Sequence, residues 1–263
     1  MPSLTMSDGA EIYYELAGTE GKPWLTFSNS LGTNLHMWDD QLPAFEADFR
    51  ILRYDSRGHG KSSAPEGAYS ISRLGSDAIA LLDELNIEKT NWCGVSKGGM
   101  VGMWLGTNHT TRFVRMAYCN TSPYMPSVDM WNARAKAARE NGMASLEDAI
   151  VERWFTEAFR SSSVDRVDRV RTQIRSTPGG GYAGCCEAIR DMDQRETIKL
   201  IDLPVLVIAG ADDPATPPEH GKLIADSING AEFVELKEAA HLSNIEQTAA
   251  FNAAVTEFLK RNR

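Results

Sequence analysis

The sequence predicts an α/β protein built on a mostly parallel sheet, and three observations support this. Segments with the pattern of a strand alternate with segments of helical periodicity, which is typical of a sheet covered by helices. Several strand-like segments are almost continuously apolar, as expected for strands buried on both faces. The apolar run 91–95 passes through a short turn directly into a helix after Ser96. A chain of 263 residues can hold such a sheet in one domain, with room for an insertion.

The same patterns place the elements along the chain. Strands are expected at 11–16, 24–28, 50–55, 91–95, 113–119, 203–210 and 231–236. Besides the helix after Ser96, helices are expected at about 37–49, 72–85, 219–227 and 246–260. The pair Asp8-Gly9 predicts a hairpin turn just before the first of these strands.

The alternation breaks between residues 121 and 197, where no strand pattern is found. Helices are expected there at about 130–139, 146–159, 166–175 and 182–192. We interpret residues 122–195 as a helical cap insertion over the loop face of the sheet, with a core domain formed by residues 1–121 and 196–263. Within the insertion, residues 177–181 contain a proline and three glycines and are expected to form a flexible hinge.

Composition and charge exclude several classes of function. The net charge of -9 argues against nucleic acid or an anionic membrane as the main partner. The first residues contain neither a basic region nor a long apolar stretch, so we expect no signal peptide and no membrane span. The four cysteines show no C-x-x-C or zinc-like spacing, which predicts a reduced, cytoplasmic protein without a metal site.

The turn around Ser96 carries the strongest functional signal. Residues 94–98 match G-x-S-x-G, in which the serine lies on a sharp turn between a strand and a helix. Gly94 and Gly98 are expected to let the two arms of the turn pass closely. The motif alone also fits a serine that only caps a helix. The apolar strand before it and the apolar helix after it favour a nucleophile.

A serine nucleophile needs a base, usually a histidine oriented by a buried carboxylate. In this architecture the partners follow in the order serine, acid, histidine. Of the five histidines, only His241 follows Ser96 and also lies in a loop after a strand. Asp212 and Asp213 both follow the strand at 203–210. We prefer Asp213, because the proline after it favours an extended turn, and keep Asp212 as the alternative.

Two backbone amides are expected to stabilise the oxyanion that such a reaction forms. One is the amide of Lys97, directly after the nucleophile. The other belongs to the loop after the strand at 24–28, and Leu31 is our candidate. Lys97 is unusual, because a cation in the first turn of a helix opposes the helix dipole. We expect its side chain to point to solvent; the alternative is that its ammonium faces an anion.

These motifs resemble the α/β-hydrolase fold family over essentially the whole chain. Residues 55–62 are similar to the D-x-R-G-x-G-x-S turn of that family, which we interpret as structural, with His59 a loop residue and not a catalyst. The resemblance implies the α/β-hydrolase fold, a mostly parallel eight-stranded sheet with helices on both faces and a helical cap insertion.

Within that family, three segments resemble the 3-oxoadipate enol-lactonases of protocatechuate and catechol degradation. Residues 28–33 resemble their oxyanion loop, 209–218 their acid loop, and 181–193 a cap segment that is the most specific match. Lys97 departs from the pattern, since relatives often carry an uncharged residue such as methionine there. The resemblance implies hydrolysis of a small-molecule lactone through an acyl-enzyme, with no metal or cofactor.

The substrate implied by this resemblance carries a free carboxylate, which needs a donor. Candidates in the insertion are Arg134 and Arg190, with Trp131 as an apolar wall, although each could equally lie on the surface or in the core. Two alternatives remain open: a broad carboxylesterase or cofactor-free perhydrolase with the same triad, and a non-enzymatic ligand sensor. The sequence leaves the oligomeric state open.

Overall fold

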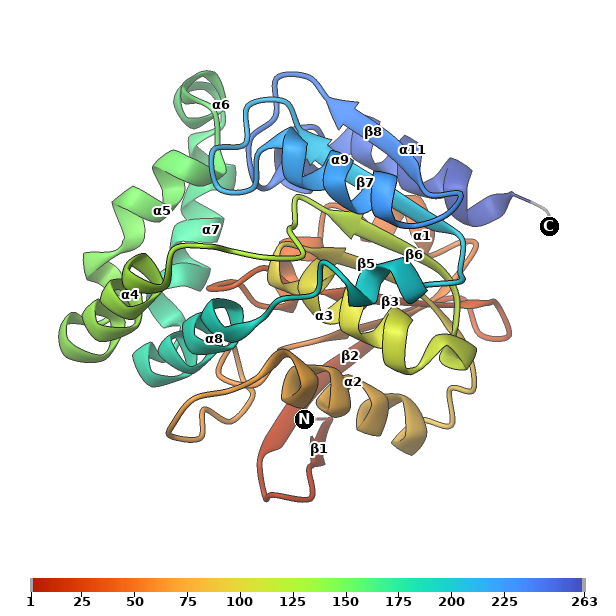
Figure 1. Cartoon of the computed structure of the whole chain (residues 1–263), viewed down its shortest axis with the longest axis horizontal. Coiled ribbons are helices and arrows are strands. Elements are labelled where there is room, and N and C mark those ends of the chain that lie inside the picture. Colours follow the sequence, from red (N-terminus) through yellow and green to blue (C-terminus); the bar gives the residue numbers. More distant parts are fainter. Residues whose placement is uncertain (1, 262–263) are drawn as a thin grey trace.

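The computed structural model describes residues 2–261, through which a mostly parallel sheet of eight strands runs (Figure 1). The strands are β1 (Ser3–Thr5), β2 (Glu11–Gly18), β3 (Trp24–Ser28), β4 (Arg50–Tyr54), β5 (Thr90–Val95), β6 (Phe113–Cys119), β7 (Val205–Gly210) and β8 (Glu232–Leu236). Their order in space is β1-β2-β4-β3-β5-β6-β7-β8. Pairing is antiparallel from β1 to β4 and parallel from there to β8, which confirms the predicted fold class.

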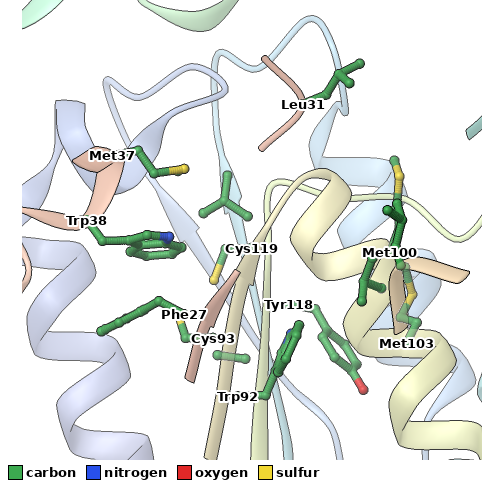
Figure 2. Packing of buried hydrophobic residues seen from close by; sticks show 14 of the residues in the cluster. Phe27, Leu31, Met37, Trp38, Trp92, Cys93, Met100, Met103, Tyr118 and Cys119 are labelled. Carbon is green, nitrogen blue, oxygen red and sulfur yellow. The ribbon is translucent and has the colours of Figure 1, made fainter. Parts of the chain in front are cut away.

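Apolar side chains fill both faces of the central strands. All six residues of β5 are buried, because β3 and β6 flank the strand and helices cover both faces. Neighbouring residues of a strand point to opposite faces, so Cys93 and Trp92 lie on different sides (Figure 2). Phe27 and Trp38 stack on the side of Cys93, with ring centroids 4.4 Å apart. Trp92 shares the other side with Tyr118 (Figure 2).

Helices form one layer on each face of the sheet (Figure 1). One layer consists of α2 (Ile71–Glu84), α3 (Lys97–Asn108) and α9 (Pro218–Ser227). The other contains α1 (Leu42–Phe45) and α11 (Thr248–Lys260), which α10 (Ser243–Glu246) precedes. Short 3-10 helices complete the core: η1 (Leu35–Trp38), η2 (Thr110–Arg112) and η4 (Thr197–Leu200). None of the helices within residues 2–261 is long and apolar enough to cross a membrane.

Between β6 and β7 the chain forms a group of helices beside the sheet, coloured green to teal in Figure 1. They are α4 (Val128–Asn141), η3 (Met143–Ser145), α5 (Glu147–Trp154), α6 (Glu157–Ser162), α7 (Val164–Ser176) and α8 (Gly179–Asp191). We call residues 122–195 the helical segment. Helices α4 and α8 pack against each other, and α7 packs against α5 and α6.

The start of α8 lies directly against the core. A Cβ atom added to Gly181 would lie 2.3 Å from the carbonyl oxygen of Gly58, and one added to Gly58 would lie 2.7 Å from the Cα of Gly181. The two backbones therefore touch with no room for a side chain at either position. The amide of Tyr69 also donates to the carbonyl of Gly184, at 3.1 Å. The helical segment is thus fixed to the core at this end of α8.

Two predicted helices are each divided in the structure. The helix expected at 37–49 is replaced by η1 and α1, because Pro43 lies in the first turn of α1 and cannot continue a preceding helix. The helix expected at 146–159 is replaced by α5 and α6. Phe155 is extended there, and the Thr156 hydroxyl caps α6 by accepting from the amide of Phe159 at 3.2 Å.

Two further expectations differ in outcome. The hairpin at Asp8-Gly9 is confirmed, and it joins β2 to β1, a three-residue strand that the sequence pattern did not reveal. The hinge expected at 177–181 is wrong in its second half, because Gly179 to Gly181 form the first turn of α8. The close contact with Gly58, and not a need for a hinge, explains the glycine at position 181.

Candidate active site

Ser96 occupies a strained turn between β5 and α3. Its backbone has φ 56° and ψ -116°, a region that residues other than glycine seldom adopt. Its amide donates to the carbonyl of Cys119 at 2.8 Å, and its carbonyl accepts from the Thr121 hydroxyl at 2.7 Å. The neighbouring strand β6 and the segment after it therefore hold the turn in its strained form.

The two glycines of the motif are required by close backbone contacts. A Cβ atom on Gly94 would lie 2.2 Å from the carbonyl oxygen of Gly98, and one on Gly98 would lie 2.1 Å from that of Ser28. The interpretation that both glycines allow the arms of the turn to pass closely is confirmed.

Asp213 and His241 form a buried pair at the ends of β7 and β8. The Oδ2 atom of Asp213 lies 2.9 Å from Nδ1 of His241. Thr216 donates to the same carboxylate from its amide at 3.0 Å and its hydroxyl at 2.8 Å. Two further donors are the amide of Ala215, at 2.8 Å, and the Asn120 side chain, at 3.0 Å.

These donors determine the charge of Asp213 and the tautomer of His241. Burial raises the pKa of Asp213, but the His241 imidazole and the hydrogen bonds from Thr216 and Asn120 outweigh it, so the pKa is lowered. The carboxylate is ionised at neutral pH and only accepts, so Nδ1 of His241 carries a proton. Nε2 of His241 is then free to accept one.

Asp212, the alternative acid, lies elsewhere. It is exposed, and its side chain forms no hydrogen bond with another residue in the described range. Its amide donates to the carbonyl of Ala239 at 2.9 Å, which only fixes the loop. The geometry therefore favours Asp213 over Asp212 as the partner of His241.

Ser96 and His241 open onto one cavity of about 260 Å³. The core also contributes Leu31 to its wall, whereas Trp131 and Arg134 come from the helical segment. A second cavity, of about 290 Å³, lies between α7 and residues 34–40. None of the predicted catalytic residues lines this second cavity, so the first one is the candidate active site.

The two predicted oxyanion donors are available. Leu31 lines the cavity. Neither its amide nor that of Lys97 donates to another atom within residues 2–261. Free amides beside the nucleophile are what an oxyanion hole requires.

The expectation that the Lys97 side chain points to solvent is wrong. Only 1% of the residue is exposed, and its Nζ atom has no hydrogen-bond partner in the described part of the chain. Burial lowers the pKa of Lys97, and the nearby groups that influence its charge are Cys185 and Asp55. The first turn of α3 is therefore covered, whereas the helix-dipole argument considered α3 alone.

The wall formed by the helical segment carries two arginines. The guanidinium of Arg134 lies 4.9 Å from the ring centroid of Trp131 and donates to the Tyr182 hydroxyl. Arg153 also lines the cavity and forms no hydrogen bond or ion pair with another described residue. Burial and the charge of Arg134 lower the pKa of Arg153. Two cations thus face one cavity, and no carboxylate of the described residues pairs with either.

Arg190, the third predicted binding residue, is not brought to the cavity. Its guanidinium pairs with Asp191 at 2.7 Å and with the Asn132 side chain at 2.7 Å, and it does not line the wall. Sequence reasoning missed Arg153, because the side of α5 that faces the cavity depends on packing. Thr216 had a usable signal, since Asp-Pro-Ala-Thr favours a turn in which the aspartate accepts from the following amides.

Metal ligands are not grouped in this structure. Within residues 2–261, no cluster of three or more histidine, cysteine, aspartate or glutamate side chains could hold a metal ion. The four cysteines at positions 93, 119, 185 and 186 are free and buried.

Comparison with known proteins identifies the class of this chain. Residues 23–248 match the family model described as alpha/beta hydrolase fold. The chain therefore belongs to the α/β-hydrolase fold family, in agreement with the sheet order and the strained serine turn described above.

More similar relatives share one printed name. The chain is 41% identical to 3-oxoadipate enol-lactonase 2 of Acinetobacter baylyi, over 98% of this chain and 96% of that protein. A crystal structure of the enol-lactonase from Burkholderia xenovorans LB400 matches with a TM-score of 0.97 and 42% identity, covering 99% of this chain and 100% of that one. A hydrolase from Pseudomonas aeruginosa PA01 gives a TM-score of 0.96 and 43% identity, covering 99% and 98% of the two chains. The resemblance to this group is confirmed.

Proposed function

We propose that this protein is a serine hydrolase that opens 3-oxoadipate enol-lactone to 3-oxoadipate, with Ser96, His241 and Asp213 as its triad. The observation that carries the proposal is the shared cavity of about 260 Å³, in which Ser96, His241 and two arginines meet. Relatives named 3-oxoadipate enol-lactonase, at 41% and 37% identity, support the choice of lactone.

The first half-reaction forms an acyl-enzyme. Oγ of Ser96 attacks the ring carbonyl while Nε2 of His241 takes the hydroxyl proton, and Asp213 stabilises the imidazolium that results. The carbonyl oxygen becomes an oxyanion, to which the amides of Leu31 and Lys97 donate. Collapse of this intermediate breaks the ring C–O bond, and His241 returns the proton to the departing enol oxygen.

The second half-reaction releases the product. Water attacks the ester carbonyl of the acyl-enzyme while His241 again accepts a proton, and the Ser96 hydroxyl is regenerated on collapse. The released enol converts to the ketone of 3-oxoadipate. Each step uses groups of this chain, the substrate and water alone.

The carboxylate of the lactone would bind to the arginine side of the cavity. Arg153 supplies unpaired guanidinium donors, and Arg134 is held in place by Trp131 and the Tyr182 hydroxyl. A carboxylate between two guanidinium groups gains charge-assisted hydrogen bonds and relieves their mutual repulsion. Trp131 forms an apolar wall beside the ring. Arg190, already paired with Asp191, has no part in this proposal.

The proposal includes the organisation of the chain and its surroundings. Residues 122–195 act as a cap, and residues 1–121 and 196–263 form the core domain that holds the triad. The partner is a small-molecule lactone, and neither nucleic acid nor a membrane is involved. The four free, buried cysteines support a reducing, cytoplasmic location.

The test is steady-state hydrolysis by the purified full-length chain, with the enol-lactone and p-nitrophenyl acetate as substrates. We expect kcat/KM to favour the lactone by about 10- to 100-fold or more, because only the lactone presents a carboxylate to the arginines. A large preference for the neutral ester would instead indicate a broad carboxylesterase. A single stoichiometric acylation without turnover would indicate a ligand sensor.

A further inference from the structure

Two loops at the carboxyl edge of the sheet are joined by hydrogen bonds. The β3 loop (residues 29–34) carries Leu31, and the β4 loop (residues 55–62) follows the neighbouring strand β4. The amide of Gly32 donates to Nε2 of His59 at 2.8 Å. Just beyond the β3 loop, the amide of Leu35 donates to Oδ1 of Asp55, also at 2.8 Å. The β4 loop thus supports the loop that carries a proposed oxyanion donor.

The hydrogen bonds of His59 determine its tautomer. None of the residue is exposed, and its Nδ1 atom lies 3.2 Å from the carbonyl oxygen of Arg57. A carbonyl oxygen only accepts, so Nδ1 carries the proton and the lone pair of Nε2 faces the amide of Gly32. Burial and the nearby Lys97 charge lower the pKa of His59 well below its usual value. A neutral imidazole is the one form that can hold both neighbours.

The backbone at Gly32 explains why this hydrogen bond controls Leu31. Gly32 has φ 83°, and a Cβ atom there would lie 3.2 Å from the ring of Tyr182. The amide of Gly32 belongs to the same peptide group as the carbonyl of Leu31, so a bond to His59 fixes that peptide plane. Fixing it restricts the backbone rotation of Leu31, whose own amide begins one residue earlier.

We propose that His59 is a positioning residue for the oxyanion hole: its imidazole holds the Leu31–Gly32 peptide so that the Leu31 amide is aimed at the cavity. His59 does not touch the substrate, and the β4 loop acts as the support of the β3 loop. The inference rests on the proposed function, because it needs a reaction that passes through an oxyanion.

Two polar variants of the full-length enzyme test this role. His59→Gln can place its side-chain oxygen near the Nε2 position and accept from Gly32. His59→Asn reaches only the Nδ1 position and leaves the Gly32 amide unpaired. His109→Asn is the matched control, since this ring packs on Trp104 at the end of α3, with centroids 5.3 Å apart.

The readouts are kcat, KM and inhibition by two probes. Phenylboronic acid forms a tetrahedral adduct with the serine and reports the oxyanion hole, whereas adipate reports ground-state binding. In His59→Asn we expect kcat and phenylboronic acid affinity to fall together by about 10- to 100-fold, because a misaimed donor loses part of the 10²–10³ that a missing donor costs. KM and adipate inhibition should change by no more than about twofold. His59→Gln and His109→Asn should remain close to the wild type.

Equal kcat and equal phenylboronic acid affinity in His59→Asn and His59→Gln would overturn the proposal. So would a parallel loss of adipate binding in His59→Asn, because it would indicate general damage to the site. If neither variant folds, ¹⁵N spectra of the wild-type enzyme with labelled histidine decide. His59 must be the neutral Nδ1–H tautomer from about pH 5 to about pH 8; an Nε2–H form or an imidazolium overturns the role. A wild-type enzyme that hydrolyses neither lactone nor ester refutes the proposed function instead.

Discussion

The two sides of the active-site cavity are built differently. On the core side, the carboxylate of Asp213 accepts five hydrogen bonds, one of them from His241. On the side of the helical segment, Nε1 of Trp131 is buried without a partner, and Arg153 has no hydrogen-bond or ion-pair partner among the described residues. The side proposed for the chemistry is saturated by the protein itself, whereas the side proposed for binding keeps donors free for a ligand.

The first way to break this comparison is to remove the nucleophile. Ser96→Ala should lower kcat for the enol-lactone by about 10⁴-fold or more, because no acyl-enzyme can form. The adipate inhibition constant measured on the wild type should be matched by direct adipate binding to the variant, since the arginine side is untouched. Activity close to that of the wild type would refute the assignment of the nucleophile.

The second prediction concerns the acid on the core side. Asp213→Asn should lower kcat by about 10³- to 10⁴-fold, because the amide can no longer stabilise the imidazolium or hold the Nδ1–H tautomer of His241. Asp212→Asn is the matched control and should stay within about twofold of the wild type. The measurement is steady-state kinetics at saturating lactone. A larger loss in Asp212→Asn would exchange the roles of the two residues.

The third prediction tests the binding side. Arg153→Gln should raise KM for the enol-lactone by about 10- to 100-fold, the usual effect of losing a charge-assisted hydrogen bond, and should leave kcat almost unchanged. Kinetics with p-nitrophenyl acetate should be unaffected, because this ester has no carboxylate. Arg190→Gln serves as the control, since Arg190 is paired with Asp191 outside the cavity. An equal effect on both substrates would contradict the proposed anchor.

The fourth prediction concerns Lys97, which is buried below the cavity on the core side. Lys97→Met should raise the free energy of unfolding at neutral pH by about 1–3 kcal/mol, because a buried polar group without a hydrogen bond is replaced by an apolar one of similar shape. Urea denaturation measures the change. Lys89→Met, at an exposed position, should shift the stability by no more than about 0.5 kcal/mol. Destabilisation by Lys97→Met would show that the ammonium is well solvated in the fold.

The smallest expected effect is a pH dependence of stability. The pKa of His59 is lowered in the folded state, so below about pH 6.5 the unfolded chain binds a proton there that the folded chain does not. Stability should therefore rise with pH from about pH 5 to about pH 7, with a contribution of at most about 1.4 kcal/mol per pH unit from this residue. His59→Gln should make the rise less steep in urea denaturation. An unchanged slope would contradict a neutral His59.

The comparison of the two sides also explains what could be predicted from the sequence. The motif around Ser96 is local, and the positions of Asp213 and His241 follow from strand ends and chain order. The structure brings these three residues to one place, as the sequence predicted. The fold class was similarly accessible, because the apolar strands alternate with helices in a regular way.

The remaining site depends on packing between segments far apart in the chain. Which side of α5 carries Arg153 into the cavity is fixed by contacts that no local pattern encodes. Arg190 appeared equally suitable in sequence, but its neighbour Asp191 neutralises it. Lys97 was misplaced for the same reason, since its burial depends on long-range packing around α3. Reasoning on a single helix cannot anticipate what lies on top of it.

The contact between Gly58 and Gly181 limits how this enzyme could be redesigned. The two backbones meet where a Cβ atom on either residue would lie within 2.3–2.9 Å of the other. A chimera that exchanges residues 122–195 for another lid must therefore supply glycine at the first turn of its last helix, or import a matching version of residues 55–62. Because residues 55–62 also hold the Leu31 loop through His59, a poorly matched graft would disturb catalysis as well as substrate choice.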